Sequence, residues 1–231
     1  MIREKYEAVW KQIAERFAKY DEHLIFESMN EESDGTYDGD PNKEYYANLN
    51  QYNQIFVDTV RGTGEKNTHR WLLVPGWNTN IEYTIGDYGF EMPTDEKCSA
   101  GESRMMVSVH YYDPWDYCGI EDLKTILWGE YGDNLIEVNG FPKMNKAKWG
   151  DESYLDDLFS RMQEKFVKND IPVIIGEYGC IDKSSAYADF AGQIQGNRAY
   201  WDGYVAGKAA SMGMIPVYWD NGFNGVYGFG L

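Results

Sequence analysis

The segment Ile171–Gly179 reads IPVIIGEYG and carries the strongest indication of the fold. Its apolar run is short, β-branched and nearly continuous, which is typical of a strand buried on both faces of a parallel sheet. The stretch Ser153–Lys168 before it and the stretch Arg198–Met212 after it have a helical period. A strand flanked by helices predicts a βα unit, with Glu177 at the carboxyl end of the strand.

Similar units are predicted on both sides of this one. Helices are expected over Glu4–Lys19 and Lys43–Thr63, whereas Tyr111–Trp149 has no clear period and is expected to be a long functional loop. The pattern predicts an α/β fold of about five parallel βα units in one domain, residues 1–231. The other four predicted strands are His23–Met29 (HLIFESM), Trp71–Pro75 (WLLVP), Met105–His110 (MMVSVH) and Ile215–Trp219 (IPVYW).

The composition narrows the class of ligand. The 231 residues include 19 Tyr and 8 Trp, and the formal charge is −17. This charge disfavours nucleic acid and anionic membrane surfaces, and no apolar run approaches the ~18 residues of a membrane span. Many aromatic residues in a polar chain suit a neutral, flat, hydroxyl-rich ligand such as a polysaccharide, although most of them are expected to fill the core.

Polar and aromatic side chains gather where the predicted strands end. In an α/β barrel the active site is built at the carboxyl ends of the strands. All five predicted strands end in such a cluster, so a functional site is expected there. The clusters are Asn30 and Glu31, Trp77 and Asn78, His110 and Tyr112, Glu177 and Tyr178, and Trp219 with Asp220 and Asn221.

Two carboxylates in these clusters predict the cleavage of a glycosidic bond. One carboxylic acid must protonate the leaving oxygen, and one carboxylate must attack the sugar carbon or activate water. The acid needs a raised pKa, which burial or a neighbouring negative charge supplies. Glu177 at the end of a buried strand is costly without a partner. Glu31 is also compatible with a solvated loop acid, because Glu32 and Asp34 stand beside it.

Neither a metal centre nor a disulfide framework is expected. No His and carboxylate residues have metal-ligand spacing, and His23 and His69 are interpreted as structural. The three cysteines, Cys98, Cys118 and Cys180, allow at most one disulfide. The sequence predicts no cofactor.

The strand motifs together resemble family 5 glycoside hydrolases, over essentially the whole chain and in family order. The resemblance implies a partial (β/α)8 barrel, equivalent to strands 4–8, and a retaining endo-β-1,4-glucanase (a cellulase) acting on β-glucan. The motifs are HLIFESMNE (23–31), WLLVPGWNTN (71–80), VSVHYYDPW (107–115), IPVIIGEYG (171–179) and IPVYWDNG (215–222).

The same resemblance implies the role of each site residue. Glu31 is expected to be the acid/base and Glu177 the nucleophile, with their carboxyl groups ~5–5.5 Å apart, the retaining geometry. Asn30 is expected to bind the sugar 2-hydroxyl, and Tyr112 to orient Glu177. His110 is expected to line the site. Three tryptophans are expected to stack on sugars: Trp219 under the sugar nearest the scissile bond, and Trp77 and Trp115 further along the cleft.

The chain also departs from the family pattern. Three βα units that would precede Met1 are absent from this sequence, and with them an Arg and a His near the nucleophile. Glu32 stands where the family has Pro. Five strands cannot close a barrel, so we expect two long apolar sheet edges and a homo-oligomer that covers them. Capping by the amino-terminal helix and the long loops is the alternative. The resemblance implies secretion, although the charged start at residues 1–16 does not resemble a signal peptide.

Two other functions remain open at this stage. The first is a hydrolase of the same fold that acts on xyloglucan, lichenan or mannan. The second is a catalytically inactive remnant that binds glycan or only assembles.

Overall fold

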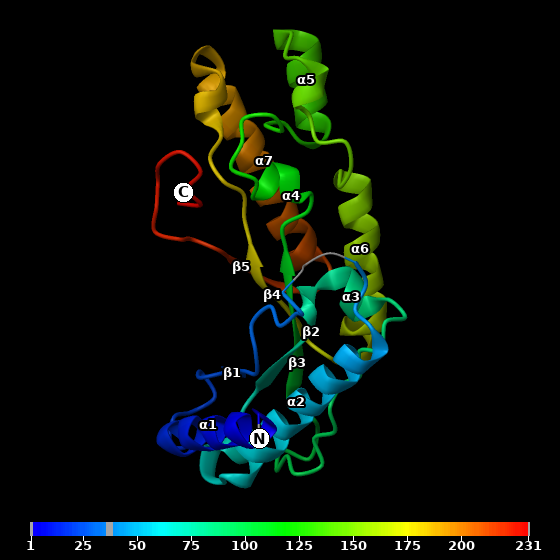
Figure 1. The fold of residues 1–231 in the computed structure, drawn as a ribbon, viewed down its shortest axis with the longest axis vertical. Coiled ribbons are helices and arrows are strands. Elements are labelled where there is room, and N and C mark those ends of the chain that lie inside the picture. Colours follow the sequence, from blue (N-terminus) through cyan, green and yellow to red (C-terminus); the bar gives the residue numbers. More distant parts are fainter. Residues whose placement is uncertain (1, 36–38, 231) are drawn as a thin grey trace. The chain divides into compact units, whose positions relative to one another are not determined.

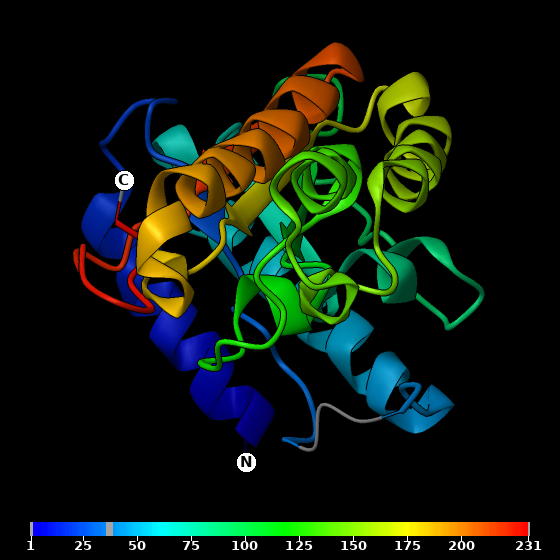
Figure 2. The same ribbon diagram turned by 90° about the horizontal axis from the view of Figure 1, so that it is seen from above.

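The computed structural model of the protein describes residues 2–35 and 39–230 (Figures 1 and 2). Within these residues, five strands form one sheet in the order β1-β2-β3-β4-β5, so each strand pairs with the next along the chain. β1 runs parallel to β2, with Phe26 opposite Leu72. The strands are β1 (Phe26–Glu27), β2 (Leu72–Asn80), β3 (Met105–Tyr111), β4 (Val173–Tyr178) and β5 (Ile215–Tyr218).

The α-helices alternate with these strands, as the periodicity predicts. They are α1 (Ile2–Phe17), α2 (Lys43–Gly62), α3 (Ile81–Ile85), α4 (Trp115–Cys118), α5 (Gly129–Asn139), α6 (Glu152–Lys165) and α7 (Ala191–Ser211). None of the helices in the described residues is long and apolar enough to cross a membrane.

The structure consists of two compact units. Unit 1 comprises residues 1–109 and 168–174, and unit 2 comprises residues 110–167 and 175–231. β3 and β4 each begin in unit 1 and end in unit 2. The carboxyl ends of these two strands, where the sequence predicts catalytic side chains, therefore belong to unit 2.

The core of unit 1 lies between α1, α2 and the start of the sheet. α1 packs on α2, and the Trp10 ring meets Phe56 edge-on with centroids 4.4 Å apart. Side chains at a helical spacing on α2, including Tyr46, Leu49 and Phe56, are buried. The helix begins with a cap, because the Asn42 side chain accepts a hydrogen bond from Tyr45 N.

The core of unit 2 surrounds α7, which contacts both α5 and α6 (Figures 1 and 2). Trp201 on α7 is fully buried and stacks on Tyr111, with centroids 5.8 Å apart and planes 11° apart. Phe159 from α6 also contacts Tyr111, in an edge-on arrangement with centroids 5.2 Å apart. This aromatic layer supports the end of β3, directly before Tyr112.

Two sequence-based expectations about the elements are wrong. The stretch Tyr111–Trp149 contains α4 and α5. α5 has two glycines and only three buried positions (Gly129, Gly132 and Leu135), so its sequence lacks a clear apolar period. β1 has only two residues rather than the seven of His23–Met29. The expected long edge is therefore absent at β1.

Candidate active site

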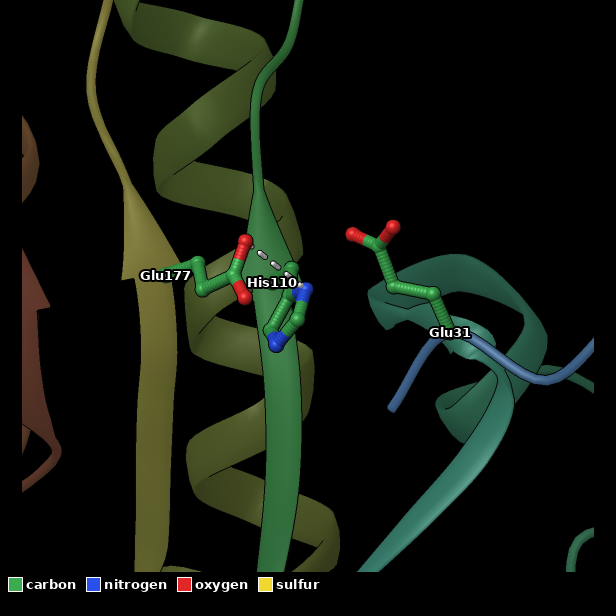
Figure 3. Close-up of side chains that lie close together, drawn as sticks. All are labelled: Glu31, His110 and Glu177. Atoms are coloured by element: carbon green, nitrogen blue, oxygen red, sulfur yellow. Dashed lines mark ion pairs between the residues drawn. The ribbon is translucent and has the colours of Figure 1, made fainter. Parts of the chain in front are cut away.

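Unit 2 brings three of the predicted site residues into contact. Tyr112 Oη donates a hydrogen bond of 2.9 Å to Glu177 Oε2. His110 Nδ1 lies 3.5 Å from the same carboxylate oxygen (Figure 3). Both side chains are well shielded, with 5% of His110 and 16% of Glu177 exposed. A carboxylate held by two polar groups in a shielded site has the fixed orientation that a nucleophile needs.

Two of the predicted tryptophans, both exposed, belong to the same unit. Trp115 begins α4, and its ring lies edge-on to Tyr112 with centroids 5.9 Å apart. Trp219 directly follows β5, and its backbone N–H donates to Tyr178 O at 2.9 Å. Both residues are about half exposed, 52% for Trp115 and 43% for Trp219. Exposed indole faces are suited to stacking on the apolar faces of sugar rings.

In unit 1, Glu31 has an unusual backbone conformation that hydrogen bonds maintain. Its φ is 51°, and Asn78 (52°) and Thr79 (50°) share the left-handed region, which is rare for a β-branched residue such as Thr79. Glu31 N donates to Thr79 Oγ1 at 2.9 Å, and Asn78 N donates to Glu32 O at 2.9 Å. Such strained residues concentrate at functional sites, because the surrounding contacts must impose them.

Trp77 and Asn30 also belong to unit 1. The Trp77 ring stacks on Tyr45, with centroids 5.6 Å apart and planes 7° apart. Its backbone N–H donates to Tyr46 Oη at 3.1 Å, and this hydroxyl donates in turn to Tyr83 O. Asn30, next to Glu31, is exposed. Trp77 is therefore supported on one face by another aromatic ring.

Sequence reasoning missed three residues that contact the predicted ones. Thr79 holds the Glu31 backbone, Tyr45 stacks on Trp77, and the Phe229 ring lies edge-on to Tyr112 at 6.0 Å. The polar run Asn78–Asn80, at the carboxyl end of β2, was a usable indication for Thr79. Nothing local in the sequence connects Phe229 to Tyr112, which precedes it by more than half of the chain.

Two acids of unit 2 have raised pKa values. Burial raises the pKa of Asp113, next to Tyr112, to about 6, and Tyr154 Oη donates to its carboxyl group at 3.3 Å. Burial likewise raises the pKa of Asp202 on α7 to about 7. Two contacts partly oppose that rise: Arg198 lies 4.0 Å from Asp202, and the Cys180 thiol lies 3.8 Å from it. Cys98, Cys118 and Cys180 are free thiols.

Comparison with known proteins agrees with this arrangement of elements. The chain is 50% identical to endoglucanase A of Paenibacillus barcinonensis over all of its residues. A family 5 xyloglucanase from Paenibacillus pabuli, solved with a ligand, matches the whole chain with a TM-score of 0.90 and 50% identity. A broad-specificity endoglucanase from Bacteroides salanitronis matches all of it with a TM-score of 0.84 and 38% identity. The predicted partial (β/α)8 fold, five parallel strands with flanking helices, is thereby confirmed.

The match covers only part of each relative. The chain spans 56% of the length of the Paenibacillus barcinonensis enzyme, 62% of the xyloglucanase chain and 57% of the Bacteroides salanitronis chain. The family profile described as cellulase (glycosyl hydrolase family 5) matches residues 2–225. The chain therefore belongs to the cellulase family, glycosyl hydrolase family 5.

Proposed function

We propose that this chain acts in a retaining endo-β-1,4-glucanase, with Glu177 as the nucleophile and Glu31 as the acid/base, in one catalytic domain over residues 1–231. The observation that carries the proposal is the hydrogen bond from Tyr112 Oη to Glu177 Oε2. A hydroxyl that donates to a shielded carboxylate fixes the direction in which the carboxylate oxygens point. The family membership and the endoglucanase among its relatives support the same reading.

The proposed reaction has two displacements at one sugar carbon. In the first, a Glu177 carboxylate oxygen bonds to the anomeric carbon while Glu31 gives its proton to the glycosidic oxygen, and the carbon–oxygen bond breaks. In the second, Glu31 takes a proton from water, the water oxygen bonds to the anomeric carbon, and Glu177 is released. Two inversions retain the configuration. This mechanism requires a carboxyl separation of ~5–5.5 Å.

Auxiliary roles follow from side-chain chemistry. Asn30 is proposed to hydrogen-bond the sugar 2-hydroxyl, a contact that strengthens in the transition state. His110 is proposed to line the sugar site beside Glu177. Trp219, Trp115 and Trp77 are proposed to stack on successive sugars. Their exposed or ring-supported faces favour this role.

Glutamine substitutions test the proposal. Glu177→Gln and Glu31→Gln are each expected to abolish release of reducing sugar from carboxymethylcellulose and β-glucan, since glutamine neither attacks carbon nor donates an acidic proton. Glu121→Gln, an exposed residue of unit 2, is the matched control and should retain wild-type activity. NMR of the first product formed should show a β-anomer. An α-anomer, or full activity in Glu177→Gln, would rule out the retaining assignment.

A second candidate substrate is xyloglucan, since the xyloglucanase structure is 50% identical to this chain. Relative kcat/KM values on carboxymethylcellulose, lichenan, mannan and xyloglucan distinguish the two readings. Cleavage confined to xyloglucan would make it the substrate. Glycan binding without cleavage, equal in wild type and Glu177→Gln, would instead identify an inactive binding module.

We further propose that the protein is secreted and that the chain self-associates. A polymeric glucan cannot enter a cell, so its hydrolase must act outside. For self-association, the supporting observation is β5, an edge strand whose Ile215 and Val217 are 52% and 46% exposed. A second copy that covers these side chains would remove apolar surface from water.

A further inference from the structure

Tyr112 is positioned by contacts with residues both near to it and distant from it in the sequence. Its hydroxyl donates to Glu177, while its ring lies between two aromatic side chains, Trp115 on one side and Phe229 on another. Both are edge-on, with centroids 5.9 Å and 6.0 Å from Tyr112. Trp115 is half exposed. Phe229 is less exposed than Trp115, and its anchoring decides whether it can hold Tyr112.

Phe229 belongs to a segment that folds back after β5, residues 219–230, which we term the return segment. Asn221 Oδ1 accepts hydrogen bonds from the backbone N–H groups of Phe223 (3.1 Å) and Phe229 (3.2 Å) and so closes the loop. The segment is also tied to Asp182, beyond β4. Asp182 N donates to Gly228 O, and Tyr227 N donates to Asp182 O. These bonds fix the backbone on both sides of residue 228.

Two side chains hold the Phe229 backbone from the other side. Arg198 Nη2 on α7 donates to Phe229 O at 2.7 Å, and Tyr218 Oη on β5 donates to the same oxygen at 2.6 Å. Arg198 Nη2 also donates to Tyr218 Oη at 2.9 Å, which completes a triangle. The Arg198 side chain is only 13% exposed. A charge-assisted bond in such a shielded place is stronger than one in water.

The position of Phe229 depends on the lack of a side chain at residue 179. A Cβ atom at Gly179 would lie 3.2 Å from the Phe229 ring and 3.2 Å from the Tyr218 ring. Glycine at 179, two residues after Glu177, therefore lets both rings approach the strand that carries the carboxylate. Phe229 is thus anchored through its own carbonyl oxygen, and a side chain at residue 179 would crowd its ring.

We propose that Phe229 is a positioning residue for the reaction, held by Arg198 and Tyr218, and that it acts through Tyr112 on Glu177. This inference rests on the proposed function, and it assigns a catalytic purpose to the return segment. The alternative is that the return segment stabilises the fold and has no effect on the reaction. The two readings differ in one respect: a positioning residue loses its effect once the Tyr112 hydroxyl is gone.

A double-mutant cycle in the full chain tests this point. Phe229→Ala is expected to lower kcat on a soluble β-glucan by between about tenfold and about a hundredfold, since a small misplacement at the reacting centre costs that much. KM should change less than twofold. Tyr218→Phe, which keeps the ring and removes one hydroxyl, should give a smaller loss. Phe229→Leu should restore part of the activity, and Val226→Ala, an exposed position of the return segment, should match wild type.

The decisive comparison is made in the Tyr112→Phe background. There, adding Phe229→Ala should cost less than twofold, because the hydroxyl that Phe229 orients is already missing. If the kcat of the double variant falls by the product of the two single losses, the proposal is overturned. A wild-type kcat in Phe229→Ala would also overturn it.

A crystal structure of Phe229→Ala gives a readout that does not need activity. Displacement of Tyr112 Oη from Glu177 Oε2 is expected, and an unchanged contact would overturn the inference. If wild type shows no hydrolysis but Tyr112 still moves in Phe229→Ala, the proposed function is wrong. The contact by which Phe229 positions Tyr112 would still be supported.

Discussion

At the scale of single residues, backbone strain marks the proposed acid/base. Left-handed φ values at non-glycine residues cost on the order of 1–3 kcal/mol each, and Glu31 and Thr79 both have them. The bond from Glu31 N to Thr79 Oγ1 joins these two residues. Thr79 is fully buried, so its hydroxyl has a fixed direction. We interpret Thr79 as the residue that positions the Glu31 backbone.

Substitution of Thr79 tests this interpretation. Thr79→Val keeps the shape of the side chain and removes the hydroxyl, which leaves Glu31 N without its acceptor. We expect roughly a tenfold loss of kcat, about 1.4 kcal/mol in the barrier, while Thr79→Ser should retain most activity. Kinetics on β-glucan measure both. Equal activity in the valine and serine variants would show that the hydroxyl has no positioning role.

Asp202 predicts a pH dependence of stability. Its folded-state pKa of about 7 lies above the 3.8 of an unperturbed aspartate, so the folded protein holds a proton that the unfolded chain releases. The free energy of unfolding should therefore fall as the pH rises from 3.8 to about 7. The titratable and charged groups that interact with the carboxyl are Arg198, Cys180 and Tyr218, together with Tyr117, Cys118 and Tyr178. The expected effect is on the order of 2 kcal/mol.

Urea unfolding at pH 5 and pH 8 measures this effect. In Asp202→Asn, the free energy of unfolding should fall much less between pH 5 and pH 8 than in wild type, because asparagine does not titrate. Asp157→Asn, an exposed position on α6, is the control and should keep the wild-type slope. A wild-type slope in Asp202→Asn would place the pH dependence on another group.

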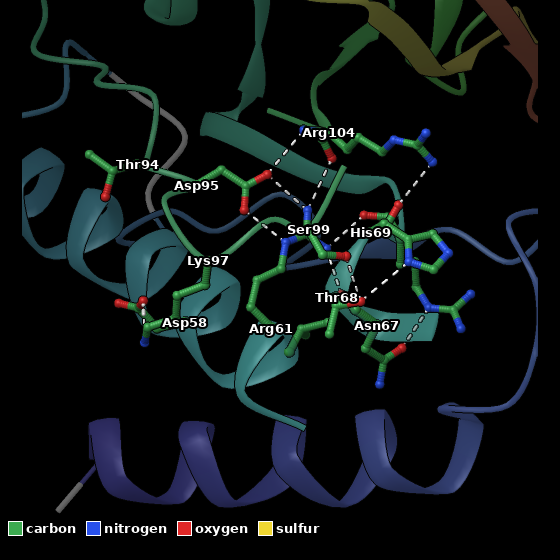
Figure 4. Close-up of polar contacts among 12 residues, drawn as sticks. Asp58, Arg61, Asn67, Thr68, His69, Thr94, Asp95, Lys97, Ser99 and Arg104 are labelled. Atoms are coloured by element: carbon green, nitrogen blue, oxygen red, sulfur yellow. Dashed lines mark hydrogen bonds and ion pairs between the residues drawn. The ribbon is translucent and has the colours of Figure 1, made fainter. Parts of the chain in front are cut away.

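At the scale of elements, a buried ion pair ties α2 to the segment that leads into β3. Arg61 on α2 makes two bonds to Asp95, at 2.7 and 2.9 Å, with both side chains essentially unexposed (Figure 4). Arg61 also donates to the carbonyls of Asn67 and Arg70, and Asp95 accepts from Arg104 N directly before β3. The pair therefore fixes where β2 and β3 begin.

Neutralising this pair should be costly. Asp95→Asn is expected to lower the free energy of unfolding by about 3–5 kcal/mol, since it leaves the Arg61 charge buried without its partner. Asp58→Asn breaks the exposed pair with Lys97 nearby (Figure 4) and should cost about 0–1 kcal/mol. Denaturant titrations of both variants give the comparison. Similar losses in the two variants would contradict the role assigned to Asp95.

At the scale of the whole molecule, β5 leaves apolar side chains at the edge of the sheet. Ile215 and Val217 alternate with better shielded neighbours, and Phe223 and Val226 of the return segment are also exposed. Exposed apolar edge strands favour pairing with another chain. This is the surface on which the proposed self-association depends.

Lysine at the edge tests self-association. Light scattering on wild type at micromolar concentration is expected to give a mass above that of one 26.7 kDa chain. Ile215→Lys with Val217→Lys should shift the mass to one chain, because a charge at an edge opposes pairing. Val138→Lys, at an 82% exposed position on α5, is the control and should leave the mass unchanged. One-chain mass in wild type would refute the proposal.

Sequence patterns determined the order of the βα units, because the burial of an element depends on its own period of apolar residues. They also placed Tyr112 and Glu177 at strand ends, where the structure joins them by a hydrogen bond. The same reasoning failed for α5, whose sequence has little apolar period, and for the length of β1. Edge pairing and weakly amphipathic helices depend on neighbours that no local pattern describes.

What only the tertiary structure decided is the set of contacts between residues distant in the chain. The Arg198–Tyr218–Phe229 triangle, the edge-on packing of Phe229 on Tyr112 and the strained pair of Glu31 and Thr79 all depend on which strand ends and loops come together. A periodic pattern encodes which side of an element is buried, but not which partner it meets there. The candidate catalytic residues could therefore be predicted from the sequence, whereas the side chains that orient them could not.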